Sequence, residues 1–455
     1  MLKKIAFVFC LGSKLMALSC ANSVVLSPPG ESAYGYKLTM NDKGDAGVIW
    51  FAPETGSDGD RINAAVKKRD AMWTAPFLMT RNDKDLFLKC INIDPSCNLQ
   101  AIWKVDGEDV DGDPIFQYGE KKYSDPSPTI TSFRRAPFID REKALSSEGR
   151  LIYVGATPEN EPPAEWVNMA ASILPGQTAM TVTTIAPVEG RAACRCVKFN
   201  KKGRAVLAWW QSKEVDSSFF SNKRYTLQVA REQEDGTWSA PERVCSLELN
   251  QYSIHRMKMV VDSQDNIALI WEETNFHNDR KLYVIAQQNG VWSDLIKLCH
   301  SKDSYQRSRI GVDEEGNLLV IWDEPHKEGL TIGEKPFKET RTIYAAYKPL
   351  GQPWQSQSFL TPPSYYSLYP QVAVDHKGHF VLAWVHAVSE KTNVICGTTF
   401  SVKDQKWSEL QQLSLGHNCM DFKMEFSADG KGVIVWRCLN ESDHRALQVA
   451  DLIID

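Results

Sequence analysis

The sequence lacks most of the short motifs that carry enzyme chemistry. It contains no Gly-x-Ser-x-Gly nucleophile elbow, no phosphate-binding loop and no Cys-x-x-Cys pair. Histidine is scarce, with nine in 455 residues, and only His376 and His379 have a metal-ligand spacing. These two histidines span an expected turn, which favours an incidental pair. The motifs therefore predict no nucleotide-binding, zinc or serine-hydrolase class.

A surplus of basic charge and a long apolar run are also missing. The net charge of -5 at pH 7 gives no reason to expect nucleic acid or an anionic membrane as a partner. After residue 21 there is no run of about 18 apolar residues, so no transmembrane segment is predicted.

Residues 1–21 have the features of an export signal. Two basic residues, Lys3 and Lys4, precede an apolar stretch, and small residues lead up to Ala21. We expect cleavage after Ala21, with lipidation at Cys20 or a retained segment as alternatives. The sequence thus predicts an exported protein, in the periplasm, on the envelope or secreted.

One pattern is abundant, namely an apolar alternation, an Asp, a Gly three residues later and an apolar run that ends in Trp. Its clearest copy is 372–384, with the turn at Asp375 and Gly378. Alternation followed by a Gly-containing tight turn predicts a β-hairpin. The closing aromatic residue recurs at steps of 50 to 62 residues: Trp50, Trp103, Tyr153, Trp209, Trp271, Trp322, Trp384 and Trp436. A β-rich unit repeated at this length predicts a radial array of small sheets.

Each full unit is expected to have four strands, and the last unit lacks one. Its third strand is Leu447 to Leu452, after which the chain stops, whereas residues 23–27 form a strand signal without a unit. We therefore predict one all-β domain over 22–455, a β-propeller of about eight four-stranded blades closed by the N-terminal strand. Seven blades plus an insertion is the alternative, because the repeated sequence pattern is weakest over 104–190. The recurrent Trp residues are expected to pack between blades.

The repeated sequence pattern resembles that of bacterial extracytoplasmic β-propellers of the sialidase-like and lectin-like kind. The last copy, 426–431, also resembles the strand-turn phrase of TolB-type propellers. The resemblance covers nearly all of the chain after residue 21 and implies the fold more than a function. The sialidase Asp-box, S-x-D-x-G-x-x-W, does not fit, because about nine residues separate Asp from Trp here.

Propeller topology predicts which residues share a face. The first strand of a blade starts on the face where the second ends, so the residue six places before each turn Asp lies near the mouth of the central channel. Arg256, Arg307 and Tyr369 hold this position in three consecutive units, and Lys258 and Arg309 follow two residues later, facing the channel. Cations beside an aromatic residue predict a site for an anionic ligand, such as an acidic sugar or a carboxylate. A wet channel that tolerates any polar side chain is the alternative.

Two long connections, 211–223 and 323–341, are expected on the same face, where loops on a rigid scaffold usually bind ligands. A separate acidic group suggests a calcium site, because clustered carboxylates supply the oxygens that Ca²⁺ needs. Its members are Asp58, Asp60, Asp109, Asp111 and Asp113. They lack EF-hand spacing, so solvated acidic turns are the alternative, and no other cofactor is expected.

The function expected from these features is non-enzymatic binding of a glycan or protein on the long-loop face. A sialidase-like glycoside hydrolase is the first alternative. Residues 133–137 resemble the sialidase F-R-I-P phrase with one residue too many, Arg256 and Arg307 could extend an arginine cluster, and Tyr369 could be the nucleophile. An envelope assembly scaffold is the second alternative.

Cysteine pairing is predicted at one place. Nine cysteines remain after Ala21, so at least one is expected to be unpaired or intermolecular. Cys419 and Cys438 flank the last hairpin and lie opposite one another if Ser427 pairs with Gly430. A bulge at the glycine would shift this register by one residue.

Overall fold

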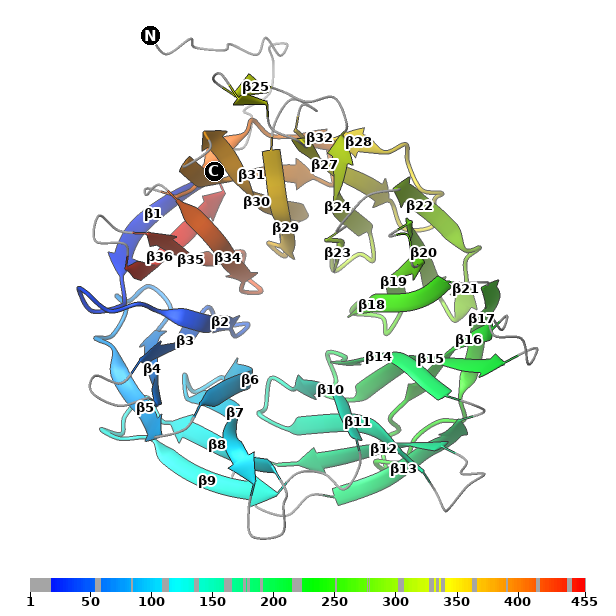
Figure 1. Ribbon diagram of the computed structural model, residues 1–455, viewed down its shortest axis with the longest axis horizontal. Coiled ribbons are helices and arrows are strands. Elements are labelled where there is room, and N and C mark those ends of the chain that lie inside the picture. The colour runs from blue at the N-terminus through cyan, green and yellow to red at the C-terminus, as the bar shows by residue number, and fades with distance from the viewer. Residues whose placement is uncertain are drawn as a thin grey trace.

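The chain folds into a ring of antiparallel sheets (Figure 1). The computed structural model describes residues 18–454 except 54–58, 83–84, 109–113, 135–138, 159–165, 175–176, 178–180, 189–190, 215–222, 250–251, 276, 278, 302–306, 327–330, 333–334, 337–339, 362–365, 390–391, 415–417 and 440–443. All regular structure in these residues is strand. Among them there is accordingly no helix that is long and apolar enough to cross a bilayer.

The first four repeats each form a four-stranded sheet in which the first strand lies nearest the centre of the ring (Figure 1). In chain order the strands are β2 (Tyr34–Met40), β3 (Ala46–Pro53), β4 (Asp60–Lys67) and β5 (Phe77–Asn82); β6 (Leu86–Ile93), β7 (Leu99–Glu108), β8 (Pro114–Lys121) and β9 (Thr129–Arg134); β10 (Ile139–Leu145), β11 (Leu151–Pro158), β12 (Trp166–Ile173) and β13 (Thr181–Val188); β14 (Arg191–Phe199), β15 (Ala205–Glu214), β16 (Lys223–Arg231) and β17 (Glu242–Leu249).

The second half of the ring repeats the same order with short outer strands. The strands are β18 (Tyr252–Val261), β19 (Ile267–Asn275), β20 (Arg280–Gln288), β21 (Val291–Trp292) and β22 (Ile296–Ser301); β23 (Arg309–Val312), β24 (Leu318–His326), β27 (Thr340–Lys348) and β28 (Ser358–Phe359); β29 (Tyr366–Val374), β30 (His379–Ser389), β31 (Thr392–Ser401), β32 (Lys406–Trp407) and β33 (Gln411–Gln412). One parallel pair, Arg341 with Tyr366, joins the last two groups into a nine-stranded sheet. A small ribbon, β25 (Thr331–Ile332) with β26 (Lys335–Pro336), lies between β24 and β27 in the chain.

This architecture is a β-propeller, which confirms the predicted fold class. The number of blades stays a prediction. The turn between the first two strands explains the recurrent Asp. In β18–β19, Oδ1 of Asp262 accepts hydrogen bonds from the backbone N–H of Gln264 at 2.8 Å and of Asn266 at 2.9 Å. The residue three places after the turn residue has a positive φ, as at Gly316 (87°) and Gly378 (91°), where glycine avoids strain.

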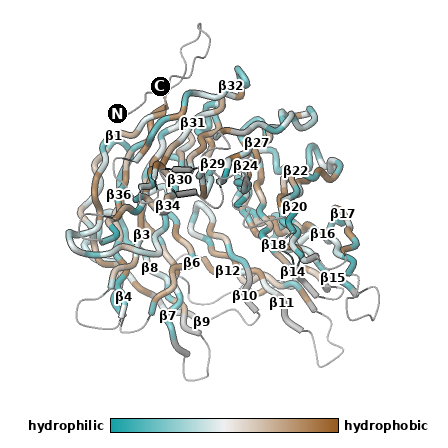
Figure 2. Tube along the Cα trace, turned by 45° about the horizontal axis from the view of Figure 1, so that its top comes forward, coloured by the Kyte–Doolittle hydropathy of each residue, from teal (hydrophilic) through white to brown (hydrophobic). Residues whose placement is uncertain are grey.

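The recurrent Trp residues are buried between sheets, as predicted. Trp50, Trp103, Trp209, Trp271, Trp322 and Trp436 are 0% exposed and Trp384 is 1% exposed. Trp271, for example, packs edge to face on Trp210 of the preceding sheet, with ring centroids 5.0 Å apart. Hydrophobic positions accordingly run along the strands throughout the ring (Figure 2). These side chains hold neighbouring sheets together.

The ring is closed by its first and last strands. Strand β1 (Leu18–Val25) pairs antiparallel with β36 (Arg445–Ile454), which continues through β35 (Gly432–Leu439) to β34 (Cys419–Phe426). This pairing confirms closure by the N-terminal strand. The strand begins before the expected cleavage site at Ala21, because Leu18 already pairs with Ile454 and is 1% exposed. Cleavage after Ala21 therefore stays a prediction, and residues 1–17 lie outside the described residues.

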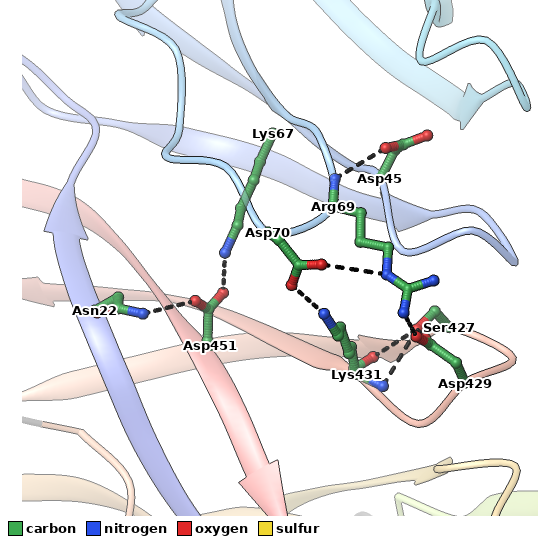
Figure 3. A network of polar contacts seen from close by, with 9 residues as sticks. All are labelled: Asn22, Asp45, Lys67, Arg69, Asp70, Ser427, Asp429, Lys431 and Asp451. Atoms are coloured by element: carbon green, nitrogen blue, oxygen red, sulfur yellow. Dashed lines mark hydrogen bonds and ion pairs between the residues drawn. The ribbon is translucent and has the colours of Figure 1, made fainter.

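A polar network fastens the closing sheet to the first sheet of the chain (Figure 3). Arg69, in the turn after β4, contacts Asp429 at 2.6 Å, and its backbone N–H donates to Asp45 at 2.9 Å. Lys67 pairs with Asp451, which also accepts a hydrogen bond from Asn22 at 3.1 Å. Strands from both ends of the chain therefore share one set of ion pairs.

The predicted disulfide joins Cys419 and Cys438. The register expected from the turn is one residue out along most of the hairpin, where Phe426 pairs with Gly432. A bulge between Cys419 and Asp421 restores the expected pairing at the cysteines themselves. The bond was thus predicted correctly, although the register that suggested it was wrong.

Candidate functional site

The predicted ligand residues lie on the inner strands and next to two irregularities of the backbone. The register shifts between His255 and Lys258 in β18 and between Leu368 and Gln371 in β29. These bulges contain Arg256 and Tyr369, whose φ angles are 52° and 58°. Left-handed φ is uncommon for residues other than glycine, and such strain gathers at functional sites. The bulges re-aim both side chains relative to regular strands.

Arg307 and Tyr369 form a stacked pair. The guanidinium carbon of Arg307 lies 3.4 Å from the ring centroid of Tyr369, which is a close cation–π contact. The Nη1 atom of Arg307 is buried and has no hydrogen-bond partner within the described part of the chain. One face of the tyrosine is thus covered by the arginine, so Tyr369 positions Arg307.

Two further cations lie on the same inner strands, close to this pair. Lys258 donates through Nζ to the backbone carbonyl of Ser308, and Nη1 of Arg309 donates to the same carbonyl at 2.9 Å. Nε of Arg309 also donates to Oε1 of Gln371 at 3.1 Å. The predicted neighbours from consecutive blades are therefore brought together.

The positive charges in this cluster lower the pKa values of their neighbours. Burial lowers the pKa of Lys258 to about 7, and the like charges of Arg309, Arg256 and Lys423 add to this effect. Burial and the nearby Arg307 likewise lower the pKa of Arg309. Positive charge is therefore in excess at this place, which favours an incoming anion.

Two buried acids support the cluster and were not predicted. Glu272 follows Trp271 in β19 and is 0% exposed, and Asp323 follows Trp322 in β24 and is 1% exposed. The corresponding residues of the other repeats are Phe51, Lys104, Val154, Trp210, Val385 and Arg437. An acid directly after the repeat Trp was thus a signal available in the sequence.

Each acid holds arginines in place. Oε2 of Glu272 lies 3.6 Å from Nη1 of Arg256 and 3.5 Å from Nη1 of Arg280. Oδ2 of Asp323 accepts from Nε of Arg341 at 2.8 Å, and Oδ1 accepts from the backbone N–H of Arg307 at 2.7 Å. Burial raises the pKa of Glu272, although the surrounding cations oppose this shift.

Glu272 and Asp323 thus act as anchors for the arginines. A carboxylate that is fully buried and engaged with arginine is poorly placed to reach a ligand, whereas it can fix the direction of a guanidinium.

The predicted acidic group is only partly within the described residues. Asp60 opens β4 and accepts a hydrogen bond from the Tyr34 hydroxyl. Asp58, Asp109, Asp111 and Asp113 lie outside the described residues. Within the part of the chain that the structure describes, no three acidic, His or Cys side chains are grouped to hold a metal ion. The calcium site stays a prediction.

The other predicted features are placed as follows. Most of the two long connections lies outside the described residues, apart from their strand ends and the β25–β26 ribbon. Arg134 ends β9, the outermost strand of its sheet (Figure 1), whereas Arg256 and Arg307 belong to the ring's inner side. The described part of the sialidase-like phrase therefore lies apart from the arginines, and residues 135–137 lie outside the described residues.

The ring of sheets with polar residues on its inner strands defines the protein as a β-propeller. No known protein-family model matches the sequence, and no characterised protein matches it at a significant level. A solved ulvan lyase of polysaccharide lyase family PL25 is 8% identical, over 94% of this chain and 95% of that chain, with a TM-score of 0.46. The polysaccharide lyase Uly1 is 10% identical, over 80% of this chain and 89% of that chain, with a TM-score of 0.43.

A further solved structure is the β-propeller domain of the trilobed protease from Pyrococcus furiosus. It is 10% identical, over 81% of this chain and 97% of that chain, with a TM-score of 0.41. The similarity in all three cases is confined to the fold.

Proposed function

We propose that the protein is an exported, non-enzymatic β-propeller that binds an anionic ligand, on a glycan or a protein, at the mouth of its ring. The observation that carries this proposal is Arg307, which stacks on Tyr369 while part of the residue stays accessible to solvent. A guanidinium donates several hydrogen bonds in a fixed fork that matches a carboxylate or a sulfate. The pKa values of Lys258 and Arg309 are lowered by burial and by neighbouring cations, which also favours an anionic ligand.

Binding is favoured over glycoside hydrolysis by the state of the candidate catalytic groups. A retaining or inverting glycosidase needs accessible carboxyl groups, and a sialidase-like enzyme needs a reachable tyrosine hydroxyl beside an arginine cluster. Here Glu272 and Asp323 are buried against arginines, so neither carboxyl group is accessible. A protein ligand in the cell envelope would make the propeller an assembly scaffold, which the same site would serve.

The test is the double substitution Arg256→Ala with Arg307→Ala. We expect at least a tenfold loss of affinity for acidic glycans on a glycan array, about 1.4 kcal/mol, with an unchanged melting temperature. Lys377→Ala with Glu315→Ala, both in turns of the opposite face, is the matched control and should bind normally.

Three outcomes would contradict the proposal. They are loss of binding in the control, wild-type protein that binds no acidic glycan and captures no envelope protein, and turnover of an aryl-sialoside. Export is checked separately by cell fractionation with N-terminal sequencing.

A further inference from the structure

Two lysines on neighbouring inner strands continue the cationic cluster. Lys37 in β2 and Lys423 in β34 occupy the same place in their repeats as Lys258 and Arg309, four residues before the turn residue. Strands β2 and β34 lie side by side in the ring (Figure 1). Neither ammonium group has a hydrogen bond or an ion pair within the described part of the chain, and Lys423 is exposed.

Around Lys37 and Lys423, positive charges outnumber the negative charges that could pair with them. Partial enclosure by the surrounding strands lowers the pKa of Lys423 although the residue is exposed, and Arg309 and Lys37 lower it further. Burial also lowers the pKa of Lys37. Asp421, an acid close to Lys423, is already held by Arg437 through two hydrogen bonds of 2.8 Å.

Glu425, the other acid close to Lys423, does not restore the balance. It lies two residues further along β34, is exposed, and interacts with both Lys198 and Lys423. One carboxylate is therefore shared between two lysines.

Together these residues make a continuous track. In strand order the five inner positions are Lys258, Arg309, Gln371, Lys423 and Lys37, and Gln371 joins it as the acceptor for Arg309. The corresponding positions of the other three inner strands are Cys90, Glu142 and Cys196, none of them cationic. At this position of the repeat, the cations therefore lie on consecutive inner strands from Lys258 to Lys37, with Gln371 between them, and are missing from the other three.

We propose that Lys37 and Lys423 form a second anion subsite, so that the ligand is an acidic oligosaccharide with charged groups repeated along its chain. This inference rests on the proposed function, since the first charged group would bind at Arg256 and Arg307. One isolated carboxylate cannot reach both ends of the track, whereas a chain of uronate units can.

An oligosaccharide fits the track better than an acidic peptide does. Peptides often bind by adding a strand to a free sheet edge, and the bulges in β2, β18, β29 and β34 interrupt that edge on the inner strands. No large hydrophobic side chain in the described residues of β2, β18, β23, β29 or β34 is exposed to receive peptide side chains. The track offers ammonium, guanidinium and amide groups, which suit hydroxyl and carboxylate oxygens.

The experiment compares galacturonate with its α-1,4-linked tetramer by titration calorimetry on the full chain. We expect wild-type protein to bind the tetramer at least tenfold more tightly than the monomer. Lys37→Gln with Lys423→Gln should remove this gain while leaving monomer affinity within about twofold, because the first subsite is intact. Arg256→Ala with Arg307→Ala should weaken both ligands.

Lys43→Gln with Lys377→Gln, in turns of the opposite face, is the matched control and should keep the gain. Equal affinity of wild-type protein for monomer and tetramer overturns the second subsite and leaves the proposed function standing. No binding of either sugar overturns the assignment to a uronate chain, and the glycan array and envelope-protein capture then decide the proposed function separately. Hexaglutamate that binds as tightly as the tetramer, with the same dependence on Lys37 and Lys423, overturns the assignment to a saccharide.

Discussion

The stacking of Arg307 on Tyr369 turns an aromatic side chain into a support for a charged one. A guanidinium over a ring gains about 0.5–2 kcal/mol and loses freedom of movement before any ligand arrives. The guanidinium is thereby held in one orientation before a ligand binds. Pre-organisation of this kind raises affinity without adding contacts.

This role gives a test at Tyr369. Tyr369→Leu removes the ring beneath Arg307, so affinity for tetragalacturonate should fall about tenfold with little change in melting temperature, about 1.4 kcal/mol. Tyr369→Phe keeps the ring and should bind as wild type. An equal loss in both variants would show that the hydroxyl, rather than the ring, contributes to binding.

Lys258 predicts how binding depends on pH. Its pKa is lowered to about 7, so the ammonium is partly deprotonated at neutral pH, while an anion favours the charged form. Affinity for the tetramer should therefore rise as the pH falls from 8 to 6, by up to about tenfold.

The measurement is calorimetry at three pH values in buffers of different ionisation enthalpy, which also reports proton uptake on binding. Lys258→Gln should flatten the profile. Tighter binding at pH 8 than at pH 6 would contradict the assignment.

Much of this site could be predicted from single residues, but not all of it. The repeat positions of Arg256, Arg307 and Tyr369 follow from counting back along an alternating strand, because the side-chain period is two. The bulges that place Arg256 and Tyr369 at positive φ leave no mark in the alternation. The covering of Tyr369 by Arg307 depends on these bulges, and so it could not be derived.

Strand β1 has a larger role than its faint sequence signal suggests. Its pairs with β36 extend from Leu18–Ile454 to Val25–Gln448, and Leu18 is buried in the cluster that also holds Val381 and Leu413. Removal of residues 1–25 should therefore lower the free energy of unfolding by at least about 3 kcal/mol, since loss of one buried Leu side chain alone costs about 2–5 kcal/mol.

Two shorter truncations complete this experiment, measured by thermal and urea melts. Removal of residues 1–17 should leave stability unchanged, and removal of residues 1–21 should give an intermediate melt because Val24 and Val25 still pair. Identical melts for all three chains would contradict closure of the ring by β1.

Among the strands, those with local signals were the easiest to predict. Even the region 104–190, where the repeat is weakest in the sequence, contains the regular strands β8, β9, β12 and β13. The start of β1 was harder, because residues 18–21 satisfy a cleavage pattern and a strand pattern together. The strand pattern becomes evident only through the partner strand β36, which is distant in the sequence. Asn22 of β1 and Asp451 of β36, for example, are 429 residues apart and form a hydrogen bond.

For the molecule as a whole, periodicity predicted the ring, and the ring determined which residues meet. Residues distant in sequence, such as Lys37 and Lys423, become neighbours only because the ring closes. Conversely, the sialidase-like grouping of Arg134 with Arg256 was drawn from a short phrase without its place in the ring. Its described part, Phe133 and Arg134, ends an outer strand, away from the inner strands that carry Arg256.

Closure by β1 and β36 also sets an order of events during synthesis. At roughly 5–20 residues per second, β36 is completed about 20–90 s after β1 has been made. Until then the apolar first strand has no partner, and the growing ring has two open edges. A chain interrupted at any point before β36 keeps both edges bare, which exposes it to aggregation and proteases. The joint between β1 and β36 therefore forms only in chains that have been synthesised through β36.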